Sequence, residues 1–594
     1  MALLTFDSID YPVLAGGLLL VGFIYTIYRS ILPRPLEGIP YNVAATKRIF
    51  GDLPEVRAYG SLTDWLATQA VKHQSPIFQA FIRPISKPWV VVTDYYEASE
   101  ICTRRFKEFD RGSASTSIFK GVVPGSQITL QSHNPQFKKN KDLVRNLMTP
   151  TFLSEVRRIH DRAHGQDKVM LTLMCIQVSA PEIYDKFSRL VELWNLKLDH
   201  ADGKFFAASR DIHHAALDII VCASFGIDTQ DTQLVKEKDQ LSIEPRSEND
   251  GEISFKEVPL REELGALTVL SESVAKVVRT PSPPFFHFLY RNLSSQMRNA
   301  IALTRKLQRR EIANGIKRRQ NGEAMKCALD EISVREEATA KKEGREPDYH
   351  SQTIASELMS YLIGGHETTS STIRWGISYL SRDQRAQSEL RKGLQEAYQQ
   401  AKSEKRPPTL TEIIQTRVPY LDAVIDETLR VSYTFGLTLR EAVVDTQLLG
   451  AHIPKGTAIA FLSNGPGVLS PPIQYDESRS SEWVRVRKPK QPADQEYAFP
   501  DFVPERWLKS VVSEAGKKKV VFDSQAVPIQ AFGQGPRGCF GKRLAYLEMK
   551  IFFTLIIWTF ELLPLPAHVA TPKEVSSLTR YPDRVFIKPR RVVL

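Results

Sequence analysis

One glycine-rich stretch near the carboxyl end, Phe532 to Gly541, constrains this chain more than any other. It reads Phe-Gly-Gln-Gly-Pro-Arg-Gly-Cys-Phe-Gly. Glycine accepts positive φ and lets another group approach the backbone closely. A helical pattern begins directly afterwards at Lys542, so we expect Cys539 on a tight loop whose amides and following helix N-terminus point at its sulfur. Such surroundings favour a thiolate over a thiol.

Cys539 has two interpretations. A lone cysteine in a glycine-rich turn is most often a small buried side chain. A thiolate beside a flat cleft made by glycines is instead suited to be an axial ligand of haem iron. The spacing is far more specific than a lone cysteine and favours the haem ligand. The residues that make up this spacing are Phe532, Gly535, Arg537, Cys539 and Gly541.

Composition sets broader limits. The chain has 594 residues, of which 42% are hydrophobic and 25% charged, which is ample for a large core. Its cysteines are odd in number and widely spaced, which fits a reduced intracellular compartment better than a disulfide framework. The net charge of +11 is dispersed and favours an acidic partner or an anionic membrane surface. No nucleic-acid motif is present, and no glycine-rich phosphate loop follows a strand.

The N-terminus carries an apolar run from Val13 to Tyr28. Acidic residues precede this run and basic residues follow it, which predicts an uncleaved anchor over about residues 11–28 with the rest of the chain on the cytosolic side. A buried core helix is the alternative, because the run is short for a membrane span. The stretch from Pro33 to Pro40 is proline-rich and is expected to be a stiff spacer. Residues 1–32 are therefore the anchor and the start of a hinge, and residues 33–594 form one domain.

The rest of the chain is expected to be mainly α with a small β-rich region. Short β-rich runs from Phe78 to Thr93 predict a hairpin. Helical patterns dominate from about Asn134 to Leu429, and strand character returns from Thr446 to Ala460. Two Glu/Lys/Asp-rich segments, near 228–259 and 321–348, are expected to be exposed charged insertions.

A second motif lies inside the helical pattern from Ser351 to Leu380. It reads Gly364-Gly365-His366-Glu367-Thr368-Thr369. Two glycines within a helix cost roughly 1 kcal/mol each relative to alanine, so they need a compensating role. Close approach of a flat ligand, with Glu367 and Thr368 as a proton relay, is one role. Helix packing through small residues is the other, and the motif alone leaves both open.

A third pattern is Glu427-Thr428-Leu429-Arg430, which places an acid and an arginine on one helix face. Taken alone, it indicates a common surface ion pair. A later stretch, Phe502 to Trp507, contains Arg506, whose planar guanidinium suits a buried network with such a pair.

Together these motifs, in this order, resemble the cytochrome P-450 superfamily, the haem-thiolate monooxygenases, of the membrane-anchored microsomal type. The resemblance covers roughly Pro33 to the C-terminus and implies the P-450 fold. It implies Cys539 as the axial thiolate ligand of haem b, within the loop that includes Phe532, Gly535 and Gly541. It also implies Glu367 and Thr368 as the proton-delivering acid and alcohol, and Glu427, Arg430 and Arg506 as a structural triad.

The resemblance further implies three arginines at the haem propionates, namely Arg537, Arg440 and Arg145. Arg145 precedes Asn146 to Phe152, which resembles the end of the family's third helix. The chain departs from the family pattern four residues before Arg145, where Lys141 replaces the usual tryptophan or histidine.

The implied reaction inserts one atom of O2 into a lipophilic small molecule. Electrons would come from a separate NADPH-cytochrome P-450 reductase, with cytochrome b5 as a further donor, at the endoplasmic reticulum membrane. A haem-thiolate isomerase or dehydratase, and a non-catalytic haem or lipid-binding protein, are the alternatives. The pocket is expected to involve the loop after Phe109, residues 260–293 and residues 431–439. Sterols, fatty acids, terpenoids and polyketides all remain open as substrates.

Overall fold

The computed structural model describes residues 11–148, 179–227, 229–242, 251–278, 280, 282–323, 325–489, 499–512, 516 and 518–594, and structural statements below concern these residues. Parts of several predicted features lie outside them: residues 1–10 of the segment 1–32, residues 149–178 of the helical stretch, which include Thr149 to Phe152 after Arg145, residues 228 and 243–250 of the first charged segment, residues 279 and 281 of the expected pocket segment, and residue 324 of the second charged segment.

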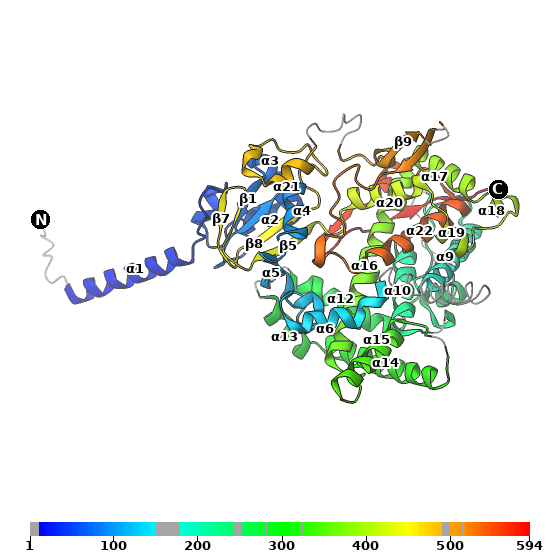
Figure 1. The fold of residues 1–594 in the computed structure, drawn as a ribbon, viewed down its shortest axis with the longest axis horizontal. Coiled ribbons are helices and arrows are strands. Elements are labelled where there is room, and N and C mark those ends of the chain that lie inside the picture. Colours follow the sequence, from blue (N-terminus) through cyan, green and yellow to red (C-terminus); the bar gives the residue numbers. More distant parts are fainter. Residues whose placement is uncertain are drawn as a thin grey trace, which may run out of the picture.

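The molecule combines a small β-rich region with a larger helical region (Figure 1). The helices that lie nearest the β-rich region are short. Their bounds are α2 Leu53–Tyr59, α3 Leu62–His73, α4 Tyr95–Thr103, α5 Ser113–Thr116 and α21 Glu482–Arg487. The helices of the larger region are α6 Pro135–Val144, α9 Ala180–Ala201, α10 Ser209–Phe225, α11 Gln233–Asp239, α12 Glu262–Val278, α13 Pro283–Leu293, α14 Ser295–Gln320, α15 Ala328–Glu343, α16 Gln352–Arg382, α17 Gln384–Ala397, α18 Gln399–Ser403, α19 Leu410–Gln415, α20 Pro419–Ser432, α22 Lys542–Thr559 and α23 Ala567–Ala570.

A five-stranded sheet with the order β1-β2-β8-β5-β3 forms most of the β-rich region. The predicted hairpin is confirmed, because β1 (Ile77–Ala80) pairs antiparallel with β2 (Trp89–Val92). Strand β8 (Ala458–Leu462) runs parallel to β2 and antiparallel to β5 (Leu437–Ala442). Strand β3 (Phe109–Asp110) closes the edge beside β5. The remaining strands form two-stranded sheets: β6 Thr446–Leu448 with β7 Ala451–Ile453, β9 Leu508–Val512 with β10 Lys518–Phe522, β11 Phe560–Leu562 with β15 Pro589–Arg591, β12 Glu574–Ser576 with β13 Arg580–Pro582, and β4 Phe206–Ala207 with β14 Phe586–Ile587.

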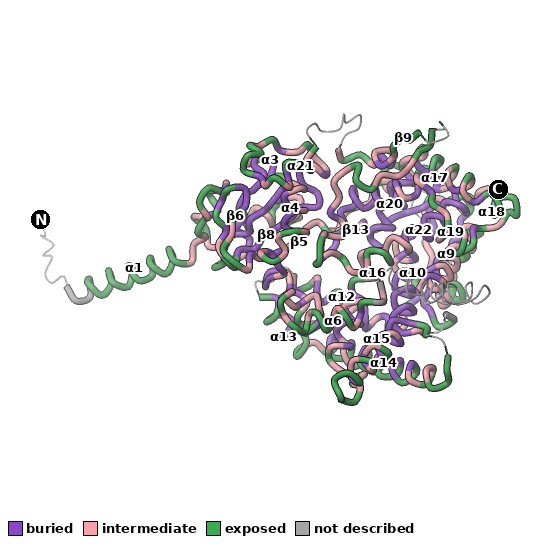
Figure 2. The backbone as a smooth tube through the Cα atoms, in the orientation of Figure 1, coloured by how far each residue is buried: buried purple, intermediate pink, exposed green. Residues whose placement is uncertain are grey.

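Helix α16 runs through the helical region and is buried along most of its length (Figure 2). It packs against α10, α20 and α22, and its carboxyl-terminal half presents buried residues on every face. A helix that is apolar or small all round lies inside a protein rather than at its surface. Because of this central position, side chains on different faces of α16 lie against different neighbouring helices.

The second charged segment differs from expectation. Residues 321–348 contain α15, which buries Leu329 and Ile332 in the main core and also buries Ala340. These positions recur at helical spacing between the charged residues, which is the pattern of an amphipathic helix rather than an exposed loop. The high charge content concealed this apolar stripe, so the prediction of an exposed segment is wrong for the buried face of α15, whereas residues 341–346 are exposed.

Helix α1 (Tyr11–Ile31) extends away from the body, and the side chains from Leu18 to Val21 are exposed (Figure 1). Among the residues that the structure describes, no helix combines the length and the apolar character that crossing a membrane requires.

Candidate functional site

The loop that carries Cys539 is held in a closed, glycine-dependent shape. The backbone amide of Cys539 donates to the carbonyl of Phe532 at 2.7 Å, which closes the loop. Gly533 and Gly535 both have positive φ, at +59° and +69°. A side chain at Gly535 would overlap the carbonyl oxygen of Cys102 in α4, so only glycine fits there. The loop is therefore fixed against α4 and delivers its cysteine to the start of α22.

The sulfur of Cys539 lies in a mixed electrostatic environment. Its side chain keeps exposed surface although protein surrounds most of it. Burial raises the pKa of the Cys539 thiol, while the backbone amides of Gly541 and Lys542 and the guanidinium of Arg111 act to lower it. A metal ion at this sulfur would add the positive charge that makes a cysteine bind as thiolate. The expected thiolate thus depends on a bound ion as well as on the helix terminus.

Three arginines gather near this loop. Arg537 is buried, and its Nε lies 3.5 Å from Asp110. Burial lowers the pKa of Arg537 to about 10, with Asp110 opposing the shift and Arg440 adding to it. Burial, followed by repulsion from Arg537 and Arg440, also lowers the pKa of Arg111 to about 9. The guanidiniums of Arg111, Arg440 and Arg537 are therefore close enough to repel one another.

This cluster fits the two propionates of a haem. Among the described residues, Nε and Nη1 of Arg537 make no hydrogen bond although they are buried. Asp110 is already engaged by the amide and hydroxyl of Ser132, so it cannot balance three guanidiniums. Buried cations need an anionic partner. Carboxylates placed here would supply the missing acceptors, and the sulfur of Cys539 would be available to bind iron.

Arg111 was missing from the sequence prediction. It follows the short strand β3, and its Nη1 donates to the carbonyl of Ile128 at 2.8 Å. Arg111 belongs to no motif in which a second residue follows at a fixed spacing, so the sequence alone does not single it out. Its position in the loop after Phe109, already expected to border the pocket, was the one available indication.

Arg145, the third predicted propionate contact, is not brought into this cluster. It lies at the end of α6 with its side chain 60% exposed, and its Nη1 is 3.8 Å from Asp142. The unusual Lys141 instead donates to the carbonyl of Pro536 at 3.3 Å and so contacts the cysteine loop. A contact between Arg145 and a propionate stays a prediction.

A cavity of about 550 Å³ opens beside the cluster. Its described wall comes largely from the loop after Phe109, and residues 260–293 and 431–439 contribute none of it. A substrate pocket formed by all three segments stays a prediction. The lining residues that matter here are Arg111, Thr116, Lys120, Leu130, His133 and Glu441. Most of these side chains are polar or charged, but the cavity wall also exposes apolar surface, so the lining does not decide between charged and lipophilic groups.

The glycine pair in α16 has two separate explanations. A side chain at Gly365 would overlap Ile220 of α10, so this glycine permits close helix packing. A Cβ at Gly364 would meet no described atom within 4 Å, so this glycine leaves the helix surface open. Thr368 donates its hydroxyl to the carbonyl of Gly364 at 2.7 Å. The packing interpretation is therefore correct for Gly365, while the approach of a flat ligand at Gly364 and the proton relay stay predictions. The helix is continuous from Gln352 to Arg382.

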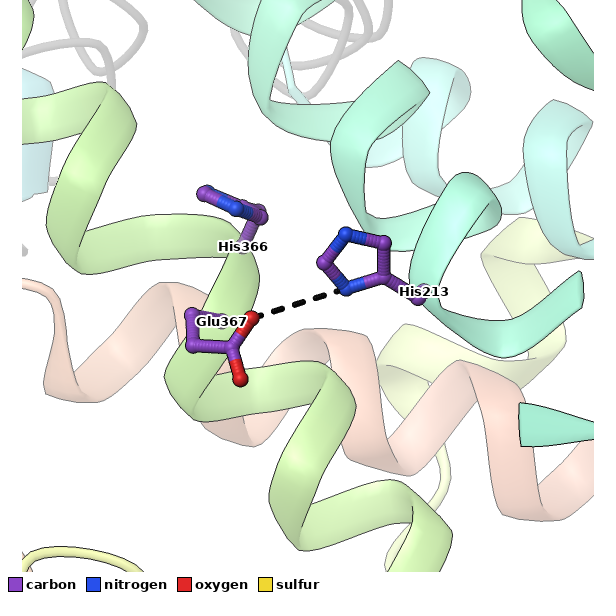
Figure 3. Close-up of side chains that lie close together, drawn as sticks. All are labelled: His213, His366 and Glu367. Atoms are coloured by element: carbon purple, nitrogen blue, oxygen red, sulfur yellow. Dashed lines mark ion pairs between the residues drawn. The ribbon is translucent and has the colours of Figure 1, made fainter. Parts of the chain in front are cut away.

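Glu367 faces polar groups between α10 and α16 (Figure 3). Its Oε2 lies 3.6 Å from Nδ1 of His213, and its Oε1 lies 3.5 Å from Nη2 of Arg374. Burial lowers the pKa of His213 well below its ordinary value, and the neighbouring His366, His214 and Arg374 add to this effect. The carboxylate is thus linked to groups that lie more than a hundred residues apart in sequence.

The predicted triad forms as a buried network. Oε1 and Oε2 of Glu427 accept from Arg430 at 2.7 and 2.8 Å, and Nε of Arg506 lies 3.4 Å from Oε1. The amide of Val503 and the indole of Trp507 also donate to Glu427, at 2.8 and 3.0 Å. The pair from α20 therefore fixes the segment that leads to the cysteine loop, and it is not a surface ion pair.

The comparison with known families decides the identity of this fold. The sequence profile named Cytochrome P450 matches residues 46–466 and 494–588. The chain belongs to the cytochrome P450 family. The predicted P450 fold, mainly helical with a small β-rich region, and the predicted P450 oxidoreductase class are confirmed.

Curated relatives of this P450 span nearly its whole length. It is 32% identical to cytochrome P450 monooxygenase TRI13 of Fusarium sporotrichioides, over 97% of this chain and 98% of that protein. It is 31% identical to cytochrome P450 monooxygenase GME11363 of Pestalotiopsis microspora, over 96% of each chain. The crystal structure of cytochrome P450 CYP102L1 shares the fold with a TM-score of 0.63 and 16% identity, over 94% of this chain and 100% of that one.

Proposed function

We propose that this P450 is a haem-dependent monooxygenase that inserts one atom of O2 into a lipophilic small molecule. The observation that carries the proposal is the acid and alcohol pair of α16. Thr368 is fixed on the carbonyl of Gly364, beside a helix surface left open by that glycine. Glu367 lies next to it in contact with His213 and Arg374. An isomerase or dehydratase of the same family needs no such pair for protons.

The residues that would hold haem b come from three parts of the chain. Cys539 would be the iron ligand, and Arg537, Arg440 and Arg111 would bind the propionates. When bound, the haem supplies the activation of O2, which a cysteine ligand favours. The protein's own task is to orient the lipophilic substrate and to bring protons to the reacting oxygen through Glu367 and Thr368.

The electron donor is proposed to be a separate NADPH-cytochrome P-450 reductase, with cytochrome b5 as a further donor. This proposal is supported by the lack of a glycine-rich phosphate loop after any strand-like segment of the sequence. We also propose that α1 anchors the protein at the endoplasmic reticulum with the body in the cytosol. The exposed apolar surface of α1 and the basic residues after it support this placement.

The anchor is tested by carbonate extraction of microsomes that carry the full chain or a chain lacking residues 1–32. We expect only the full chain to stay in the membrane pellet, with its body digested by protease added to intact vesicles. Release of the full chain would contradict the anchor, and protection of the body would reverse the topology.

The reaction class is tested with the purified haem-loaded chain. Lipophilic compounds are first screened for a change in the haem spectrum, and hits are then incubated with reductase, NADPH and O2. We expect an oxygenated product that requires both O2 and NADPH. Turnover of a peroxide without reductant would indicate the isomerase type, and no turnover of any bound compound would indicate a binding protein.

The iron ligand is tested with Cys539→Ala. We expect this variant to lose the carbon monoxide band typical of a ferrous thiolate haem, while Cys102→Ala keeps it. Cys102 is a suitable control because it is a buried cysteine of α4 whose backbone carbonyl, not its sulfur, lies against Gly535 of the same loop. Survival of the band in Cys539→Ala would contradict the assignment.

A further inference from the structure

Two histidines and one glutamate converge between α10 and α16. The potential ligand atoms of His213, His366 and Glu367 all lie within 4.8 Å of one another (Figure 3). His213 comes from α10, whereas His366 and Glu367 are neighbours on α16. The two helices approach closely here because Gly365 of α16 has no side chain against Ile220. The cluster therefore stands on two rigid elements rather than on loops.

The hydrogen bonds of the cluster leave lone pairs available. Nδ1 of His366 lies 3.0 Å from the carbonyl oxygen of Leu362. A carbonyl oxygen only accepts hydrogen bonds, so Nδ1 carries the proton. This bond fixes the tautomer and leaves Nε2 as an acceptor, the arrangement that supports most histidine ligands of metals. Nδ1 of His213 lies 3.6 Å from Glu367, which is too far for a hydrogen bond. The imidazole of His213 and the carboxylate of Glu367 thus face each other without forming a hydrogen bond.

The spacing is close to that of a zinc site. Tetrahedral Zn²⁺ with bonds of 2.0–2.1 Å separates its ligand atoms by about 3.4 Å. Rotations of the side chains can close the remaining gap, because His213 and Glu367 are 22% and 27% exposed and so are not locked in the core. The partial exposure also leaves a route for the ion and a fourth position for water.

One charged group beside the cluster, the guanidinium of Arg374, opposes cation binding, and the carboxylate of Glu367 favours it. Nη2 of Arg374 lies 3.5 Å from Oε1 of Glu367 and works against a cation. Arg374 has other partners, however, since it also bonds to Ser370 and Ser371 and lies over the ring of Tyr581. It can therefore keep its place while Glu367 turns toward His213. Two imidazoles and a carboxylate are a ligand set that Zn²⁺ takes in proteins.

We propose that His213, His366 and Glu367 bind one Zn²⁺ ion between α10 and α16. The binding test uses the tag-free, full-length haem protein, stripped with a chelator and then dialysed against zinc chloride at buffered micromolar free zinc. Zinc per haem iron is measured by mass spectrometry. We expect one zinc per chain, and an apparent affinity lowered at least about tenfold by His213→Gln or Glu367→Gln.

The control variant is His452→Gln, an exposed histidine of β7 that should keep full zinc binding. His366→Gln is a fourth variant, and circular dichroism shows whether this buried position still folds. The X-ray absorption spectrum of bound zinc should show imidazole ligands. Absence of stoichiometric zinc in the wild type would overturn the site, and so would wild-type zinc affinity in the His213→Gln and Glu367→Gln variants.

Zinc binding has a consequence that rests on the proposed function. A metal ion on Glu367 withdraws that carboxylate from proton delivery. Added zinc should therefore lower the ratio of product to NADPH consumed in the wild type, and should do so much less in His213→Gln. Stoichiometric binding with an unchanged ratio would keep the metal site and contradict the role of Glu367 in turnover.

Discussion

The hydroxyl of Thr368 donates a 2.7 Å hydrogen bond to the carbonyl oxygen of Gly364, one turn earlier in α16. A threonine that bonds back in this way satisfies its own hydroxyl and can bend the helix at that turn. The bond also fixes the hydroxyl oxygen as an acceptor on the surface that Gly364 leaves open. In the proposed relay, this oxygen would accept a hydrogen bond from the proton donor.

The first prediction concerns this hydroxyl. Thr368→Ala should leave haem content and substrate affinity nearly intact, because the helix packs through Gly365 and not through Thr368. General acid assistance is typically worth 10²–10⁴-fold, so the ratio of product to NADPH consumed should fall about tenfold or more. Thr368→Ser keeps the hydroxyl and should keep most of that ratio. An unchanged ratio in the alanine variant would remove Thr368 from the proton relay.

The second prediction concerns the buried guanidinium of Arg537. Arg537→Gln should speed the loss of haem about 10- to 100-fold, since a hydrogen bond to a charged group contributes about 1.5–3 kcal/mol. The measurement is the rate of haem transfer to excess apomyoglobin. Arg543→Gln, an exposed arginine of α22, should lose haem at the wild-type rate. Equal rates in both variants would separate Arg537 from the propionates.

The third prediction concerns the network around Glu427. Glu427→Gln leaves Arg430 and Arg506 without their buried carboxylate, and losing one partner of a buried pair costs about 3–5 kcal/mol. The free energy of unfolding in urea should drop by that amount. Glu505→Gln is the control, because its partner Arg385 is 55% exposed and such pairs contribute about 0–1 kcal/mol. Similar losses in both variants would argue against a special structural role for Glu427.

The fourth prediction concerns pH and Glu548. This α22 residue is buried, and burial raises the pKa of Glu548 from 4.5 to about 8, with Thr369 opposing the shift. The folded protein then binds the proton more tightly than the unfolded chain does. The stabilisation is complete below pH 4.5 and is lost as the pH rises to about 8, by up to about 1.4 kcal/mol per pH unit.

Glu548→Gln should abolish this loss, because glutamine stays neutral at every pH. The urea midpoint of the wild type should fall more steeply between pH 5 and pH 9 than that of the variant. The exposed Glu396 of α17 provides a matched substitution, and Glu396→Gln should follow the wild-type slope. Parallel slopes for Glu548→Gln and the wild type would contradict a protonated buried Glu548.

The sequence by itself determined the features whose signal lies in one short stretch. The cysteine loop, the glycine pair with Glu367 and Thr368, and the pair of Glu427 and Arg430 each carry a fixed local spacing. Spacing predicts loops, caps and helix faces because these depend on neighbours a few residues away. The family, the fold class and the long helix α16 follow from such stretches, and the family match and structure confirm all three.

Only the tertiary structure decided which distant groups meet. Arg111 joins Arg440 and Arg537 across more than three hundred residues, and His213 meets Glu367 across more than one hundred and fifty. Such contacts arise from how helices pack, and packing is set by burial of apolar surface rather than by the polar residues that it brings together. For the same reason α15 became part of the core, since its apolar residues share one face and its buried acids Asp330 and Glu336 are paired with arginines.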